Sequence, residues 1–176
     1  GDGRINQDDQ TWIMNPVPAF SYGLNVAVSY KNFDLSMFWQ GVADQDIYNN
    51  QKYQTDFWSI TDAGSNKGNR MLNAWTSDNT DSSIPALTTN NTADEGRVST
   101  YYVENGSYLK LRTLQLGYNV PEKFISKLKM SSLRAYISGQ NLLTLKSSSL
   151  TCSDPENPSW AYPLATSISF GLQVGF

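Results

Sequence analysis

The sequence contains no histidine and a single cysteine, and these two shortages remove several classes of function. Without histidine there is no serine-hydrolase triad, no histidine general base and no histidine-ligated metal site. Cys152 alone forms neither an internal disulfide nor a CxxC zinc pair. Catalysis by carboxylates stays open in principle, but the Asp and Glu residues mostly lie in Asn-, Ser- and Gly-rich stretches. The sequence therefore predicts a protein that is not an enzyme.

Charged residues and long apolar runs are also scarce. Charged residues make up 16% of the 176 residues, whereas typical soluble proteins have about 25%. Asn, Ser, Thr and Gln fill the difference, and aromatic residues reach 12%. The net charge of −3 does not suit nucleic acid, whose phosphates attract basic surfaces. No apolar run approaches the roughly 20 residues of a transmembrane helix, and the absence of a signal sequence leads us to expect a processed chain or a fragment.

What the sequence does contain is alternation of apolar and other residues. From Ser21 to Tyr30 every second residue is apolar, and the same holds from Phe33 to Gln40 and over the last eleven residues, which end on Phe176. A period of two gives a β-strand one apolar face. Lys31-Asn32 is a two-residue connection, and it predicts a tight hairpin in which Asn32 takes a positive φ.

Two more strands and a short helical piece are predicted in the second half of the chain. The strands cover about 106–120 and 132–145, and residues 122–129 fit one or two helical turns at the rim of the sheet. Within 106–120, Leu109 and Leu111 have the opposite parity to Leu114 and Leu116. This reversal predicts either a β-bulge or a strand that rises above a membrane.

Together these segments predict an all-β fold: an antiparallel transmembrane β-barrel segment of about five strands with long extracellular loops. Short turns alternate with long loops, and in outer-membrane barrels the short turns face the periplasm and the long loops face outside. We assign residues 1–20 to an extracellular loop segment and 21–176 to barrel strands with outer loops 41–105 and 146–165. The alternative is a soluble carbohydrate-binding β-sandwich, in which the apolar stripes face each other.

Several motifs occur in an order that resembles one known family, the SusC/RagA-type TonB-linked outer-membrane transporters of Bacteroidota. The resemblance is to the C-terminal end of these transporters and runs nearly the whole length of the chain. The motifs are Gly1 to Asp9, Pro16 to Leu24, Trp75 to Asn79, Tyr101 to Pro121, Leu133 to Thr144, Asp154-Pro-Glu156, Tyr162-Pro-Leu164 and Phe170 to Phe176.

The resemblance implies a barrel of roughly 22 strands with an N-terminal plug, located in the outer membrane of a Gram-negative bacterium. It also implies TonB-energised import of oligosaccharides or peptides, delivered by a SusD-like surface lipoprotein that acts as a lid. Five strands cannot close a barrel, which needs at least about eight. We therefore expect a C-terminal piece whose partners are the rest of the same barrel and its plug, membrane lipid, the lipoprotein, TonB through the plug, and the glycan or peptide cargo.

Three groups of residues are candidate sites. Aromatic residues of the long loop either bind sugar or the lipoprotein, or form the loop's own core, and polar residues of the fourth strand either line the solute path or belong to a solvated wall. Residues near the N-terminus match half of a calcium loop, but a half-loop supplies too few oxygen ligands, so a turn capped by its own side chains is the favoured explanation; no other cofactor is expected. The aromatic residues of the loop are Trp58, Trp75, Tyr48 and Tyr53. The polar residues of the fourth strand are Arg134, Tyr136 and Gln140, and the residues of the half calcium loop are Asp2, Asn6 and Asp9.

Overall fold

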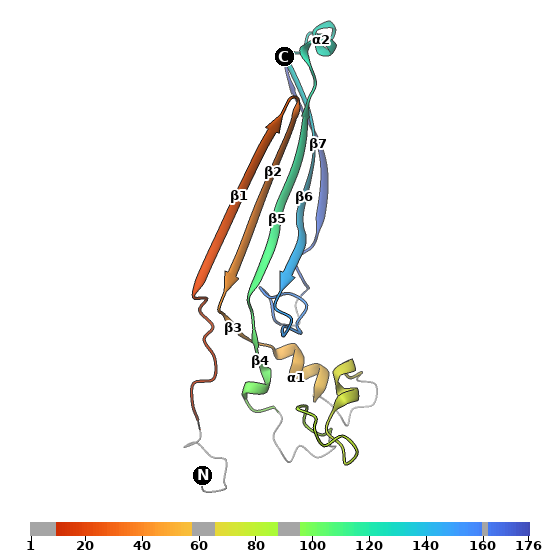
Figure 1. Cartoon of the computed structure of the whole chain (residues 1–176). Coiled ribbons are helices and arrows are strands. Elements are labelled where there is room, and N and C mark those ends of the chain that lie inside the picture. The colour runs from red at the N-terminus through yellow and green to blue at the C-terminus, as the bar shows by residue number, and fades with distance from the viewer. Residues whose placement is uncertain (1–9, 58–65, 88–95, 160–161) are drawn as a thin grey trace.

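A computed structural model describes residues 10–57, 66–87, 96–159 and 162–176. Its main element is a five-stranded antiparallel sheet in the order β1-β2-β5-β6-β7, drawn as a long curved ribbon in Figure 1. The strands are β1 (Phe20–Tyr30), β2 (Phe33–Ala43), β5 (Tyr108–Asn119), β6 (Ser132–Lys146) and β7 (Ser167–Gly175). The five strands predicted from alternation are confirmed.

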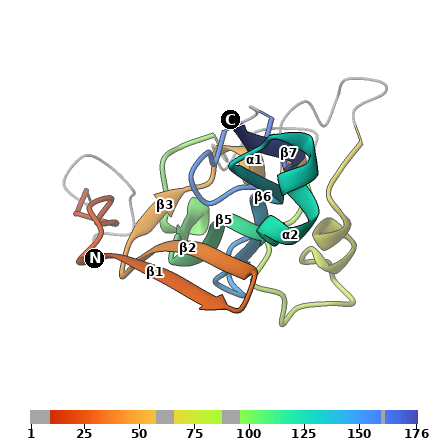
Figure 2. The ribbon, with the colours of Figure 1, turned by 90° about the horizontal axis from the view of Figure 1, so that it is seen from above.

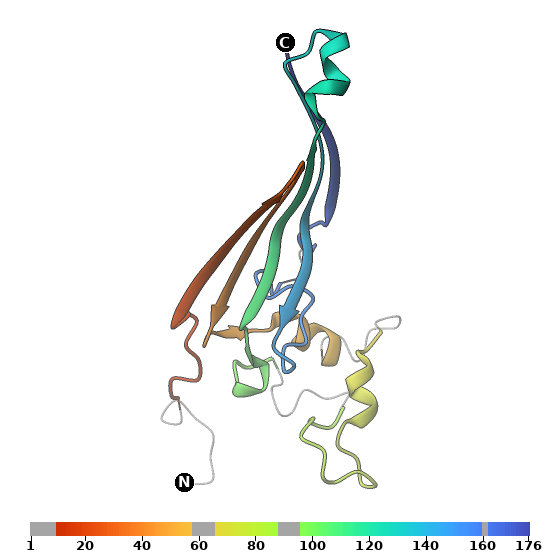
Figure 3. The ribbon, with the colours of Figure 1, turned by 45° about the horizontal axis from the view of Figure 1, so that its top comes forward.

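The short connections lie at one end of the sheet and the long connections at the other, as Figures 1 and 3 show. One end, the turn end, has the two-residue turn 31–32 and the segment 120–131, which contains α2 (Glu122–Ile125) and the 3-10 helix η4 (Ser126–Leu128). The other end, the loop end, has the long connections 44–107 and 147–166. The predicted short helical piece is confirmed, and each of the five strands of the main sheet runs between these two ends.

The β1–β2 hairpin differs from its prediction at one backbone angle. Tyr30 pairs with Phe33, so the turn has two residues, but the positive φ belongs to Lys31, at 55°, and not to Asn32. The prediction for Asn32 is wrong. Its carbonyl accepts a hydrogen bond from the Asn119 N–H at 2.8 Å, so pairing with β5 fixes that peptide. The lysine takes the left-handed conformation although this costs an L-residue about 1–2 kcal/mol.

Strand β5 contains a β-bulge, which is one of the two alternatives that the reversed leucine parity predicts. Phe38 of β2 pairs with Thr113 whereas Trp39 pairs with Leu111, which leaves Arg112 as an extra residue. The extra residue shifts by one position the alternation of side chains between the two faces of the sheet. The leucines on either side of Arg112 therefore lie on the same face of the sheet, and the apolar face continues along the whole strand.

Within the described residues no second layer covers this apolar face. Phe170 at the centre of β7 is 80% exposed, and Figure 2, which looks along the strands, shows them as one curved layer. At the turn end the face finishes in aromatic residues, with the Phe33 and Tyr118 rings 4.8 Å apart. The sandwich alternative is wrong, because the apolar stripes lie side by side on one sheet and do not pack against each other.

A buried apolar cluster lies in the loop body, by which we mean the folded part of segment 44–107. The residues packed there are Phe57, Met71, Ala74 and Tyr102. Its elements are the small antiparallel sheet of β3 (Asp46–Tyr48) and β4 (Val103–Asn105), α1 (Asn50–Asp56), and the 3-10 helices η2 (Asn69–Asn73) and η3 (Thr100–Tyr102). No helix among the described residues combines the length and apolar character needed to cross a membrane.

Candidate functional site

The polar face of the sheet carries a charged group near the turn end. Arg134 on β6 donates from Nε to Oδ1 of Asp34 on β2 at 3.0 Å, and its guanidinium lies 5.2 Å from the centre of the Tyr136 ring. The arginine spans β5 at Gly117, where an added Cβ would collide with both charged groups. Glycine at this position therefore allows the ion pair to form across the strand. Asn119 also donates to the Asp34 carboxylate, at 3.3 Å.

Two predicted site residues meet here and the third does not. Arg134 and Tyr136 form one group, while Gln140 is exposed farther along the same strand and pairs with Ser167 of β7. The Tyr136 ring also lies over Gly171 of β7, where a Cβ would overlap it. The polar face thus presents a fixed patch of arginine and tyrosine toward the turn end.

The predicted aromatic residues of the long loop lie in different environments. Tyr48 and Tyr53 are half-buried and pack against Tyr102, with ring centres 5.6 and 5.9 Å away. Trp75 lies on the surface and is 44% exposed. Trp58 lies outside the described residues. Both tyrosines thus contribute to the core of the loop body, and among the three described residues of this set Trp75 is the one that faces solvent.

The residues of the half calcium loop, Asp2, Asn6 and Asp9, also lie outside the described residues. Over the part of the chain that the structure does describe, no cluster of three or more Asp, Glu or Cys side chains is arranged to hold a metal ion.

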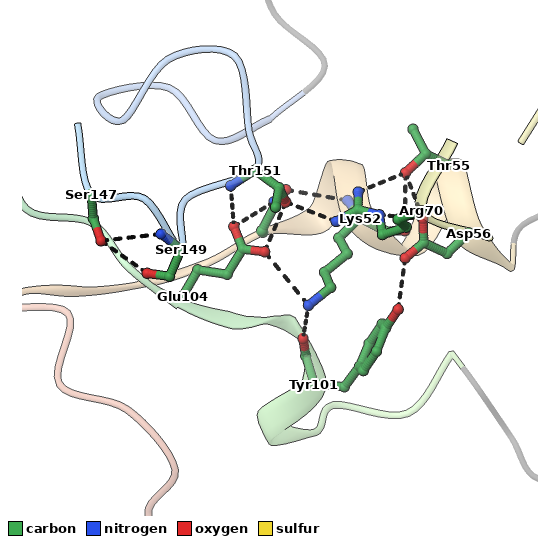
Figure 4. A network of polar contacts seen from close by, with 10 residues as sticks. Lys52, Thr55, Asp56, Arg70, Tyr101, Glu104, Ser147, Ser149 and Thr151 are labelled. Atoms are coloured by element: carbon green, nitrogen blue, oxygen red, sulfur yellow. Dashed lines mark hydrogen bonds and ion pairs between the residues drawn. The ribbon is translucent and has the colours of Figure 1, made fainter. Parts of the chain in front are cut away.

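A buried glutamate joins the two long connections, as Figure 4 shows. Glu104 Oε2 accepts from Asn49 Nδ2 at 2.9 Å and from the Thr151 N–H at 2.8 Å. Its Oε1 accepts from Thr151 Oγ1 at 2.8 Å and pairs with Lys52 Nζ at 3.5 Å. Glu104 is only 6% exposed, so its charge depends on these donors. It connects β4 and the start of the loop body to segment 147–166.

A second carboxylate, Asp56 at the end of α1, is fully buried. It accepts hydrogen bonds from Arg70 Nε at 2.8 Å, Thr55 Oγ1 at 3.0 Å and the Tyr101 hydroxyl at 2.8 Å (Figure 4). Burial, and then the neighbouring Asp56 carboxylate, raise the pKa of Tyr101 far above its ordinary value. Arg70 also donates to Thr151 Oγ1 at 2.9 Å, so this group and the Glu104 group share one threonine.

A third group binds segment 147–166 to the polar face of the sheet. Lys110 of β5 is 2% exposed, and its Nζ contacts Asp154 Oδ1 at 2.7 Å and Glu156 Oε2 at 2.6 Å. The Tyr108 hydroxyl donates to Glu156 Oε1 at 2.7 Å, and Arg112 in the bulge pairs with the same carboxylate. We call these five residues the acidic clasp.

Both acids of the clasp are held in their charged form. Burial alone would raise the pKa of Asp154, but the hydrogen bonds from Lys110 and from backbone amides outweigh it and lower the pKa. For Glu156, burial is likewise outweighed, by hydrogen bonds from Lys110, Tyr108 and Arg112, and its pKa is also lowered. The clasp is therefore an ionic contact at neutral pH.

Sequence reasoning missed all three polar groups. Asp154 and Glu156 were visible as part of a motif, and Lys110 and Arg112 as polar residues near the bulge of β5, but nothing in the sequence pairs them across more than forty positions. Glu104 also lies within a motif, Tyr101 to Pro121, but nothing in the sequence marks it as buried. Asp56 gives no signal, because an isolated acid in a polar stretch is typical of a solvated loop.

Comparison with known proteins places the chain in a family. No protein-family model matches it. TonB-dependent receptor P3 of Formosa agariphila is 37% identical over 147 residues, which cover 82% of this chain and 14% of that receptor. TonB-dependent receptor P26 of the same species is 29% identical over 202 residues, covering all of this chain and 19% of the receptor. The chain thus spans less than a fifth of the length of these curated relatives.

Solved structures agree with the sequence relatives. The RagAB peptide importer in its open-open state superposes with a TM-score of 0.80 and 26% identity over 98% of this chain and 19% of the other. A second structure, of the RagAB peptide transporter, has a TM-score of 0.78 and 25% identity over the same shares. These proteins are named as receptors and transporters, and none is named as an enzyme. The chain is therefore a part of a SusC/RagA-type TonB-dependent receptor, a β-barrel protein of the Gram-negative outer membrane.

Proposed function

We propose that this chain supplies five strands to the wall of an outer-membrane importer that takes up oligosaccharides or peptides with energy from TonB. The observation that carries this proposal is the two-sided sheet. Its apolar face exposes large apolar side chains on every strand, for example Leu24, Leu116 and Phe170, while its opposite face holds a network of arginine, aspartate and tyrosine. Such a sheet suits lipid on one side and a water-filled passage on the other.

The same geometry supports an orientation and a set of partners. The loop end would face outside and the turn end the periplasm, as the connection lengths favour. Strands β1 and β7 lie at the two edges of the sheet, and their free edges would pair with other strands of the same barrel. The patch around Arg134 and Tyr136 would face the plug, through which TonB acts.

The loop body is the part that would meet a SusD-like lipoprotein. It is a folded unit with its own buried core, and it exposes apolar side chains, among them Leu72, at 91%, and Trp75, at 44%. Rigid surfaces with aromatic residues are favoured at protein interfaces. As for cargo, the two solved relatives are named for peptides, and the polar face of this sheet suits either a peptide or an oligosaccharide.

Uptake by cells tests this function. The gene for the complete receptor polypeptide that contains this chain is deleted and then restored, and both strains are given fluorescent oligosaccharide and peptide mixtures, with and without a protonophore. We expect deletion and protonophore each to abolish uptake of one of the two mixtures, which would identify the cargo class. Uptake of both mixtures at the same rate in the deletion strain would contradict the proposal.

A further inference from the structure

We propose that residues 147–159 form an inward-folded segment that narrows the outer mouth of the solute path, and that the acidic clasp holds this segment in place. The inference rests on the proposed function, because it concerns the passage that the polar face would line. In this proposal Asp154 and Glu156 hold the segment in position, and the segment limits the size of the cargo that can pass.

The position of the segment follows from its contacts with the sheet. Lys110 pairs in register with Gln40 of β2 and with Thr144 of β6, which places it on the polar face, opposite the uncovered apolar face. Asp154 and Glu156 reach the sheet at this lysine. The segment therefore crosses the side of the sheet that faces the passage, and its backbone and side chains occupy space there.

The other side of the segment is packed against the loop body. Leu150 and Cys152 form a small buried cluster with Ile47 of β3, and Thr151 donates to Glu104. Lys146, at the end of β6, also donates to the Cys152 carbonyl. The segment is thus held between the polar face of the sheet and the loop body, and it is not a free surface loop.

The electrostatics explain why the clasp decides where the segment lies. Two basic and two acidic side chains balance one another, and Lys110 is almost completely buried. A buried ammonium without a carboxylate partner is strongly unfavourable. When both acids lose their charge, the Lys110 ammonium has no carboxylate partner and is stabilised only by water. Water reaches it only if the segment moves away from the sheet. The clasp thus favours the inward position over any position in which the segment leaves Lys110.

Cys152 offers an internal reporter of this movement. It is 1% exposed, and burial raises the pKa of its thiol, so a maleimide reacts slowly with it while the segment stays inward. The complete receptor is prepared in lipid nanodiscs as the unaltered protein and as the double variant Asp154→Asn/Glu156→Gln. Labelling of the Cys152 peptide is followed by mass spectrometry. We expect the double variant to label about tenfold faster or more.

Two further variants control this experiment. Glu122→Gln removes one negative charge from an exposed residue at the turn end and is expected to label like the unaltered receptor. Lys110→Met removes the central cation of the clasp and leaves the buried Asp154 carboxylate without its cation, so it tests the proposal from the other side of the ion pair if the double variant fails to assemble. It is expected to label faster than the unaltered receptor.

The functional readout is the longest cargo that cells import. With a ladder of oligosaccharides or peptides of increasing length, we expect the clasp variants to import longer members than the unaltered receptor and to import short members equally well. Unchanged labelling would show that the clasp does not hold the segment, and faster labelling with an unchanged length limit would show that the segment is no constriction; either result overturns the inference. Absence of any uptake by the unaltered receptor would instead overturn the proposed function, and the labelling result would stand by itself.

Discussion

The sheet and the loop body are stabilised in opposite ways. The sheet is held by regular backbone pairing and exposes large apolar side chains on every strand, whereas the loop body buries charged side chains such as Asp56 and Glu104. The sheet therefore depends on what surrounds it, because its apolar face needs lipid. The loop body depends on specific partners within the chain, because each buried charge needs its donors or acceptors.

The largest expected effect comes from placing a charge on the apolar face. Phe170 lies at the centre of β7, paired with Ile137, so Phe170→Arg would put a guanidinium near the lipid midplane and lower the free energy of unfolding by about 2–4 kcal/mol. Urea unfolding of the complete receptor in lipid vesicles measures this. Ser169→Arg, one position away on the polar face, is the matched control and should cost far less. Equal losses from both variants would contradict the two-sided sheet.

A smaller and local effect is expected in the loop body. Glu104→Ala removes the acceptor of Asn49 and Thr151 and leaves buried donors unpaired, which costs about 1–3 kcal/mol. Hydrogen exchange should show faster exchange in β3, β4 and segment 147–159, with the ladder of the five-stranded sheet unchanged. Glu122→Ala, at an exposed site, should leave exchange in the loop body as it was. Loss of protection across the whole sheet would contradict a division into two independently stabilised regions.

This division also explains what the sequence could predict. The five strands, a bulge as one of two alternatives for β5, and the arrangement of the short and long connections follow from period-two alternation, which lipid imposes on every strand of a barrel. The elements β3, β4 and α1 did not follow, because short segments in a polar stretch show no period. The pairings of Glu104 with Thr151 and of Lys110 with Asp154 and Glu156 depend on how distant segments meet. The propensity of asparagine for a positive φ favours Asn32 at this turn. In the structure the Asn32 carbonyl accepts a hydrogen bond from β5, and Lys31 has the positive φ.

Acid should weaken the acidic clasp before it weakens the backbone pairing of the sheet. The pKa values of Asp154 and Glu156 are lowered in the folded chain from their ordinary values of 3.8 and 4.5. Their contribution to stability is therefore complete above these ordinary values and is lost as the pH falls through the lowered pKa values. Hydrogen exchange of segment 147–159, corrected for the intrinsic effect of pH, should speed up only below about pH 4.

The variant Asp154→Asn/Glu156→Gln is the control for this pH effect, because it has no clasp carboxylates to protonate. Exchange in segment 147–159 should already be fast in this variant at neutral pH and should change less with acid. Loss of protection in the unaltered receptor between pH 6 and 8, which is about where histidine-type groups titrate, would contradict the assignment to the two acids.

The smallest expected effect lies at the β1–β2 turn. Lys31→Gly removes the steric cost of a left-handed L-residue and should raise the free energy of unfolding by up to about 1 kcal/mol. Asn32→Gly should bring no such gain, because its φ is not positive. Urea unfolding of the complete receptor compares the two variants. A gain from the Asn32 variant alone would mean that the turn has the conformation predicted from the sequence and not the one in the structure.

The two-sided sheet is tested most directly by spin labels placed one at a time from Ile168 to Val174 on β7, in the complete receptor reconstituted in lipid. Oxygen, which concentrates in lipid, and a water-soluble nickel chelate report the surroundings of each label. We predict that oxygen accessibility peaks at Ile168, Phe170, Leu172 and Val174, and that chelate accessibility peaks at the residues between them. Labels at the apolar positions that are immobile and inaccessible to both reagents would show burial against protein and would contradict the account.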